Sequence, residues 1–79
     1  MKVTVRFFAQ FREIVGEKQK EVEIEDGRML HDIIFRLRNE YPDLKKQKII
    51  LSLNHKYAHP EEILKDDDEI ALFPPVSGG

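Results

Sequence analysis

The sequence predicts an α+β fold, in which one main helix packs on one face of a mixed β-sheet. Two observations predict it. Apolar and polar residues alternate near both ends of the chain, as they do in half-buried strands. In the middle the apolar residues recur at helical spacing, as they do in an amphipathic helix. The 79 residues are enough for a single domain, residues 1–79, with one small core.

The N-terminal part of the chain is expected to form a β-hairpin. Alternation begins over residues 2–9, and the inward-facing residues of this strand are Val3, Val5 and Phe7. A short turn-like segment follows over residues 11–16. Alternation resumes over residues 19–25, where outward-facing glutamates predict an edge strand, because a row of charges discourages pairing with another chain.

The main helix is expected between residues 25 and 44. Its apolar residues form one stripe, which consists of Leu30, Ile33, Ile34, Leu37 and Tyr41. Asp26 is the expected N-cap, and Pro42 should end the helix shortly after Glu40. Phe35 lies off the stripe and is expected to be partly exposed.

Two further strands are expected after the helix. Residues 48–53 form the first, and residues 69–74 form the last, with a charged loop and a short hairpin arm through Tyr57 between them. The order strand, strand, helix, strand, strand is that of the β-grasp, or ubiquitin-like, fold. In this arrangement the first and last strands lie parallel at the centre of the sheet, because the helix crossover allows it.

Two aromatic residues break the alternating pattern. Phe8 falls on the polar side of the first strand, and Phe73 falls on the polar side of the last strand. If these strands are neighbours, the two rings are neighbours on the face away from the helix. Clustered exposed aromatic residues are typical of protein interfaces, so we expect Phe8 and Phe73 to bind a partner.

Composition excludes several functions. The net charge of −2 argues against general nucleic-acid binding, and the absence of cysteine removes thiolate chemistry and Cys-based metal sites. No apolar run is long enough to span a membrane, so a cytoplasmic protein is expected.

No metal site is expected, because the three histidines fall at loop-like or isolated positions: His31, His55 and His59. A basic group is expected to be a solvated face; it consists of Arg36, Arg38, Lys45, Lys46 and Lys48.

The sequence finishes with ALFPPVSGG, a strand followed by two prolines and two glycines. Pro74 and Pro75 should hold the chain extended as it leaves the sheet. Gly78 and Gly79 lack side chains and would pass through a narrow channel. We therefore expect a flexible tail over residues 74–79 whose terminal carboxylate becomes reactive once it is activated.

The chain resembles the MoaD family, which comprises the small subunits of molybdopterin synthase. The resemblance rests on VRFFAQFREIVG, on the Asn in SLNHKY and on LKDDDEIALFPPVSGG. The family often has glycine where this chain has Asp67, and often has threonine at the helix start where this chain has Arg28-Met29. Both departures concern local stability.

The resemblance implies that the chain carries sulfur and is not an enzyme on its own. A partner adenylyltransferase, similar to ubiquitin-activating enzymes, would adenylate the carboxylate of Gly79 at the expense of ATP, and a sulfur donor protein would convert it to a thiocarboxylate. The synthase large subunit would accept the tail, and the sulfur would pass to a cyclic pyranopterin phosphate during molybdenum cofactor biosynthesis. The family assembles as a heterotetramer. Gly78 would form the thin segment beside Gly79. The residues that would contact the partners are Phe8, Phe73, Pro74, Pro75, Val76 and Ser77.

The chain itself is expected to bind no cofactor. It has no Gly-rich phosphate-binding loop, so ATP must belong to the activating partner. Two alternatives remain open on the same fold and the same Gly-Gly ending. One is a ubiquitin-like modifier that is joined to lysines of other proteins, and the other is the sulfur carrier of the thiamine pathway.

Overall fold

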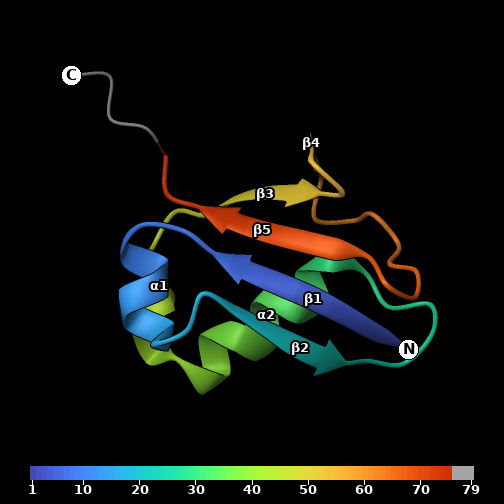
Figure 1. Ribbon diagram of the computed structural model, residues 1–79, viewed down its shortest axis with the longest axis horizontal. Coiled ribbons are helices and arrows are strands. Elements are labelled where there is room, and N and C mark those ends of the chain that lie inside the picture. Colours follow the sequence, from blue (N-terminus) through green and yellow to red (C-terminus); the bar gives the residue numbers. More distant parts are fainter. Residues whose placement is uncertain (76–79) are drawn as a thin grey trace.

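The computed structural model describes residues 1–75, which form one five-stranded sheet with helices on one side (Figure 1). The elements in chain order are β1 (Lys2–Phe7), α1 (Gln10–Val15), β2 (Gln19–Glu23), α2 (Leu30–Glu40), the 3₁₀ turn η1 (Pro42–Leu44), β3 (Ile50–Leu53), β4 (Lys56–Tyr57) and β5 (Glu69–Phe73). The predicted α+β, β-grasp arrangement is confirmed.

The sheet has the strand order β2-β1-β5-β3-β4. β1 and β5 are parallel neighbours at its centre, and the remaining pairs are antiparallel. Figure 1 shows the β1 and β5 arrows pointing the same way, with α2 behind the sheet. β2 lies at one edge, as its outward charges predicted.

The core lies between α2 and the sheet. The inward residues of β1 are fully buried, and so are Ile70 and Leu72 of β5. From α2, the predicted stripe residues Leu30, Ile33, Ile34 and Leu37 are buried against them. Each fully buried aliphatic or aromatic side chain stabilises the folded state by about 1.5–3 kcal/mol relative to exposure, and this contact holds the sheet and the helix together.

The expectation that Asp26 caps the main helix is wrong. The helix begins at Leu30, after a turn in which Gly27 has a φ of 84°. Backbone N–H groups at a helix start lack partners within the helix. Here those of Leu30 and His31 donate to the carbonyl oxygens of Glu62 and Pro60, both at 2.9 Å. A segment distant in sequence therefore sets the start of α2.

The hairpin between β3 and β4 turns on Asn54 and His55, whose φ angles are 51° and 71°. Positive φ at both central residues is the geometry of a tight two-residue hairpin, and Asn tolerates it. The Asn54 amide also joins this turn to the start of β5. It donates to the buried carboxylate of Asp68 and accepts from the Glu69 backbone N–H, both at 2.9 Å.

A polar cluster joins β2 to the end of α2. The Lys20 ammonium donates hydrogen bonds to the Glu40 carboxylate and to the Tyr41 hydroxyl. The hydrogen bond to Glu40 raises the pKa of Lys20 above its ordinary value of 10.5. The same bond lowers the pKa of Glu40, so the pair is ionised at neutral pH. Both groups are partly exposed, so solvent weakens the contribution of this pair to stability.

Asp67 has a φ of 67°, in the left-handed region that favours glycine. Replacing Asp67 with glycine should raise the free energy of unfolding by about 0.5–1 kcal/mol, because glycine has no Cβ atom to strain the backbone at this φ angle. This corresponds to a midpoint temperature about 2–8 °C higher for a domain of this size, measured by thermal unfolding.

Asp66→Gly is the matched control for this substitution. The Asp66 carboxylate accepts a hydrogen bond of 2.8 Å from the Lys2 backbone N–H, so its loss should destabilise the fold. An Asp67→Gly variant no more stable than the original chain would contradict the assignment of strain to Asp67.

Candidate functional site

The outer face of the sheet carries a stacked aromatic pair. The rings of Phe8 and Phe73 lie 4.6 Å apart between centroids, with 16° between their planes. The parallel register places them together, because Phe7 pairs with Leu72 and the Phe8 backbone N–H donates to the Leu72 carbonyl at 3.3 Å. The predicted juxtaposition of Phe8 and Phe73 is confirmed. Both rings are half-buried, because each covers part of the other.

The backbone is strained immediately beside this pair. Ala9 has a φ of 53° and a ψ of −131°, a combination that L residues rarely adopt. It turns the chain from the end of β1 into α1, where the Phe11 N–H donates back to the Phe8 carbonyl at 3.1 Å. Such strain persists only where the surroundings impose it. Here the buried ring of Phe11 and the stacked ring of Phe8 hold the turn on both sides.

Charged side chains fix the orientation of Phe8. The Arg6 guanidinium lies 5.5 Å from the centroid of the Phe8 ring and donates a hydrogen bond of 3.1 Å to Glu69. The second carboxylate oxygen of Glu69 lies 3.5 Å from His55 Nε2. Arg6 therefore contacts both the ring face and a carboxylate, which are the two kinds of partner that a planar guanidinium favours.

Two hollows flank the aromatic pair. One has a volume of about 320 Å³ and lies between Arg6, Phe8, Phe73 and the β3–β4 hairpin. The other, of about 300 Å³, is lined by Phe8, Phe73, Ile50 and Pro74 among others. Tyr57 lines both hollows and is 85% exposed. A polar rim around an aromatic centre is the composition of a protein-binding surface.

β5 ends beside this surface because of the two prolines. In the antiparallel pair, Phe73 lies opposite Ile50 and is the last residue of the strand. Proline has no N–H to donate, so Pro74 and Pro75 cannot continue the ladder along β3. Pro74 is half-buried beside Phe73, and Pro75 is exposed. The chain thus leaves the sheet next to the aromatic pair.

The other site residues that the sequence predicted lie outside the described residues. These are Val76, Ser77, Gly78 and Gly79. Within residues 1–75 no group of three or more His, Asp or Glu side chains is placed to hold a metal ion. Over the same range, no helix has the length and hydrophobicity needed to cross a membrane.

Residues 5–79 match the model of the ThiS family. The chain belongs to the ThiS family. The match covers almost the whole sequence, including the aromatic pair, the two prolines and the final Gly-Gly. Residues 1–4, which include the beginning of β1, lie outside it.

Two known proteins resemble this chain over their full length. The molybdopterin synthase sulfur carrier subunit of Chlamydomonas reinhardtii is 35% identical, with 100% of each chain covered. Among solved structures, the small archaeal modifier protein SAMP1 of Haloferax volcanii has a TM-score of 0.87 at 27% identity, again with 100% of each chain covered.

A third relative has been solved together with a partner. In a complex of subunits 1 and 2 of the molybdopterin-converting factor from Helicobacter pylori, one chain matches this protein with a TM-score of 0.70 and 29% identity. All of both chains is covered. The resemblance to the MoaD family, inferred from the sequence motifs, is confirmed.

Sequence reasoning found the aromatic pair and missed the residues around it. The alternating pattern identifies Phe8 and Phe73, because each occupies a polar position of its strand. The sequence predicts a hairpin arm at Tyr57 and no binding role for it, and Arg6 and Glu69 fall at outward-facing positions of their strands, where charged residues are common. Their contact joins residues 63 positions apart, so only the register of β1 with β5 reveals it.

The stacked rings should be energetically coupled in the free protein. Replacing Phe8 and Phe73 with alanine, singly and together, should give a coupling free energy of about 0.5–1.5 kcal/mol, since stacked aromatic side chains contribute that much beyond area burial. Urea unfolding of the four proteins measures it.

Phe8 and Phe35 form the control pair: Phe35 is an exposed residue of α2, which covers the other face of the sheet, so the two rings should show no coupling. A Phe8–Phe73 coupling indistinguishable from that of the control pair would show that the rings do not stabilise each other.

Proposed function

We propose that this chain is the sulfur-carrier subunit of molybdopterin synthase. The observation that carries the proposal is the full-length similarity to a named sulfur carrier subunit of that synthase, which includes the Gly-Gly ending. The structure supports it in one respect: the chain leaves the sheet beside the stacked, half-buried rings of Phe8 and Phe73, which could contact a partner. That arrangement suits a protein that must deliver its last residues into another protein.

The reactive group in this proposal is the carboxyl group of Gly79. A carboxylate is a poor electrophile, and transfer of AMP from ATP, with loss of pyrophosphate, converts it to a mixed anhydride. Attack on the carbonyl carbon by sulfide (HS⁻), which the donor protein supplies, then releases AMP and a proton and leaves a thiocarboxylate. The thiocarboxylate sulfur is ionised at neutral pH and is more nucleophilic than a carboxylate oxygen. The sulfur forms a bond to the pyranopterin substrate, and water then cleaves the bond between the sulfur and the acyl carbon, which leaves the sulfur on the substrate and restores the carboxylate of Gly79.

We propose that the large subunit of the synthase docks on the surface formed by Phe8, Phe73, Tyr57 and Ile50. Aromatic side chains supply most of the binding energy in many interfaces, and the charged rim of Arg6 and Glu69 orients the partner. The complex of subunits 1 and 2 from Helicobacter pylori supports this kind of partner. Ser77 and Val76 would follow the tail into the large subunit.

Activation belongs to other proteins in this scheme. The sequence has no Gly-rich phosphate-binding loop. We therefore assign ATP to an adenylyltransferase partner and assign the sulfur nucleophile to a separate donor protein. This chain is then a substrate and carrier of the reaction, and the catalytic groups are supplied by its partners.

A protein modifier is the second candidate. The structural similarity to SAMP1, which is named as a small archaeal modifier protein, favours it. Both functions need the activated carboxyl group of the last glycine. They differ in the acceptor, which is sulfur in one case and a lysine amine in the other.

Intact-mass measurement separates these functions. After incubation with the activating enzyme, ATP and a sulfur donor, the full chain should gain the mass difference between sulfur and oxygen at Gly79. A chain that lacks Gly78 and Gly79 should keep its fold and gain no sulfur, because its terminal carboxylate then belongs to Ser77, two residues short of the position that the activating partner must reach. Circular dichroism of both chains checks the fold.

Absence of the sulfur increment in the full chain would contradict the sulfur-carrier function. Fragments of this chain that run from residue 66 to residue 79 and are joined to lysines in tryptic digests of whole cells, without thiocarboxylate formation, would instead identify a modifier.

A further inference from the structure

One residue beside the aromatic pair has a backbone conformation that its residue type disfavours. The described residues with a positive φ angle are Ala9, Gly16, Gly27, Asn54, His55 and Asp67. Glycine adopts such angles freely, and Asn, Asp and His are several times more frequent there than other side chains. Alanine has neither property, so Ala9 is the exception in this set.

The conformation of Ala9 belongs to a turn that favours glycine. Its φ of 53° and ψ of −131° are close to the values of the first central residue of a type II′ turn, about 60° and −120°. The hydrogen bond from the Phe11 N–H to the Phe8 carbonyl, at 3.1 Å, closes this turn. Glycine dominates that position because it has no Cβ atom. Glycine would therefore connect β1 to α1 with less strain than alanine.

The methyl group of Ala9 does not offset this strain within the fold. Ala9 is exposed, so its side chain removes little apolar surface from water. The contacts that hold the turn come from its neighbours, the buried Phe11 and the stacked Phe8. Strained residues that the fold does not require are concentrated at binding and active sites. The side chain at position 9 is therefore a candidate for a role in binding.

Ala9 lines the hollow of about 300 Å³ beside the end of β5, which we call the exit hollow. The lining residues are Phe8, Ala9, Ile50, Tyr57, Phe73 and Pro74. Among these described residues there is no Asp, Glu, Lys, Arg or His. The exit hollow therefore suits an apolar side chain, and it differs in this from the neighbouring hollow, which Arg6 and Glu69 line.

The place where the chain leaves the sheet indicates which protein covers the exit hollow. Pro74 forms part of its wall, and Pro75 is the last described residue. Residues 76–79 follow, and four residues span at most about 14 Å. In the proposed function the large subunit takes up the carboxyl group of Gly79 in its active site, and active sites are concave. The walls of that site must therefore reach the surface around Pro74.

We propose that the methyl group of Ala9 packs against an apolar side chain that the synthase large subunit inserts into the exit hollow. The inference rests on the proposed function, which supplies this partner. Folding alone favours glycine at position 9, whereas the interface requires a side chain there. Alanine at this position therefore lowers stability and raises affinity.

The test compares thermal unfolding with calorimetric titration of the large subunit, using the full chain and its Ala9→Gly variant. The variant should unfold at a midpoint temperature about 2–8 °C higher, because the strain is relieved. It should bind the large subunit about fourfold more weakly, the factor that corresponds to one buried methyl group. A residue with a purely structural role would change stability and leave affinity unchanged.

Ala9→Ser separates the contact from the strain. Serine keeps the Cβ atom, so the midpoint temperature should change little. Its hydroxyl group would lie against an apolar side chain without a hydrogen-bond partner, so binding should weaken about tenfold.

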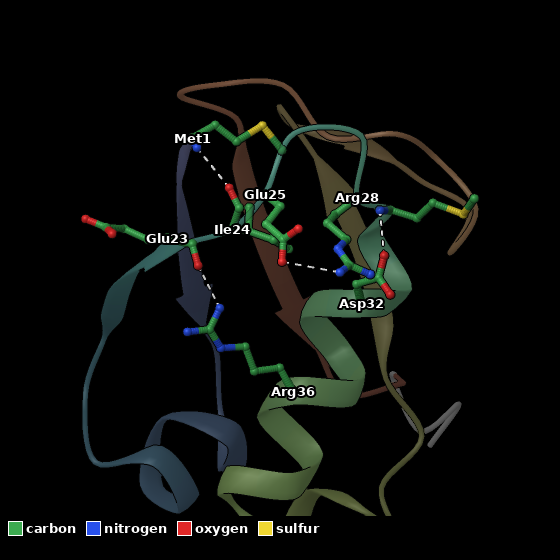
Figure 2. A network of polar contacts seen from close by, with 8 residues as sticks. Met1, Glu23, Ile24, Glu25, Arg28, Asp32 and Arg36 are labelled. Atoms are coloured by element: carbon green, nitrogen blue, oxygen red, sulfur yellow. Dashed lines mark hydrogen bonds and ion pairs between the residues drawn. The ribbon is translucent and has the colours of Figure 1, made fainter.

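Asp67→Gly is the matched control, because it relieves strain at the other end of the sheet. The Asp67 N–H donates to the Lys2 carbonyl at 2.8 Å, at the start of β1, whereas Ala9 follows the end of that strand. Figure 1 shows these two ends far apart. At the start of β1 the polar groups contact one another, as the 2.8 Å hydrogen bond from the Met1 ammonium to the Ile24 carbonyl illustrates (Figure 2). Asp67→Gly should therefore raise the midpoint temperature and leave affinity unchanged.

Several outcomes would overturn the proposal. They are Ala9→Gly binding as tightly as the original chain, or Asp67→Gly losing as much affinity as Ala9→Gly. Weaker binding of Ala9→Gly to the adenylyltransferase alone would assign the contact to that partner, and loss of self-association in the free variant would assign it to a second copy. An original chain that does not bind the large subunit would instead contradict the proposed function itself.

Discussion

The parallel pairing of β1 with β5 is the constraint on which the rest of this structure depends. Two parallel neighbours cannot be joined by a tight turn, so the chain between them must cross over the sheet. Here α2 makes that crossing and buries its apolar stripe on the way. The pairing thus creates the core, and it also places the last residue of β5 beside the end of β1.

Placement of these two strand ends explains the candidate site. Phe8 and Phe73 stack because Phe7 and Leu72 are paired. Pro74 and Pro75 then prevent the ladder from extending along β3, so the chain departs from the sheet at the aromatic surface. In the proposed function, recognition of the rings by a partner and delivery of the last residues are therefore coupled, because the two segments are joined through β5. A partner that binds the rings is already next to the chain that leads to Gly79.

The extent to which the sequence predicts this molecule depends on how local each feature is. The alternation of Val3, Val5 and Phe7 and the helical stripe depend on nearby residues, and both were predicted correctly. The polar positions of Phe8 and Phe73, with the element order, were enough to predict their contact. The start of α2 was predicted wrongly, at Asp26. The backbone N–H groups at the observed start of α2 donate to the carbonyl oxygens of Pro60 and Glu62, and a local sequence pattern cannot predict a contact with so distant a segment.

The surroundings of the aromatic pair illustrate the same limit. Arg6 and Glu69 are unremarkable outward charges until the register brings them 3.1 Å apart. Tyr57 lies on a two-residue strand whose position depends on the left-handed turn at Asn54 and His55. The family resemblance supplied the roles of Gly78 and Gly79, which no periodicity could assign. What remained beyond prediction were contacts between side chains on different elements.

The central claim is that the stacked pair beside the exit of β5 is the surface by which partners recognise this carrier. Calorimetric titration of the synthase large subunit with the full chain, and with the Phe8→Ala/Phe73→Ala variant, tests it most directly. The account predicts that the double variant, still folded by circular dichroism, binds about a hundredfold more weakly, since two central aromatic side chains are lost. Affinities within about twofold of each other, less than one anchoring side chain contributes, would contradict it.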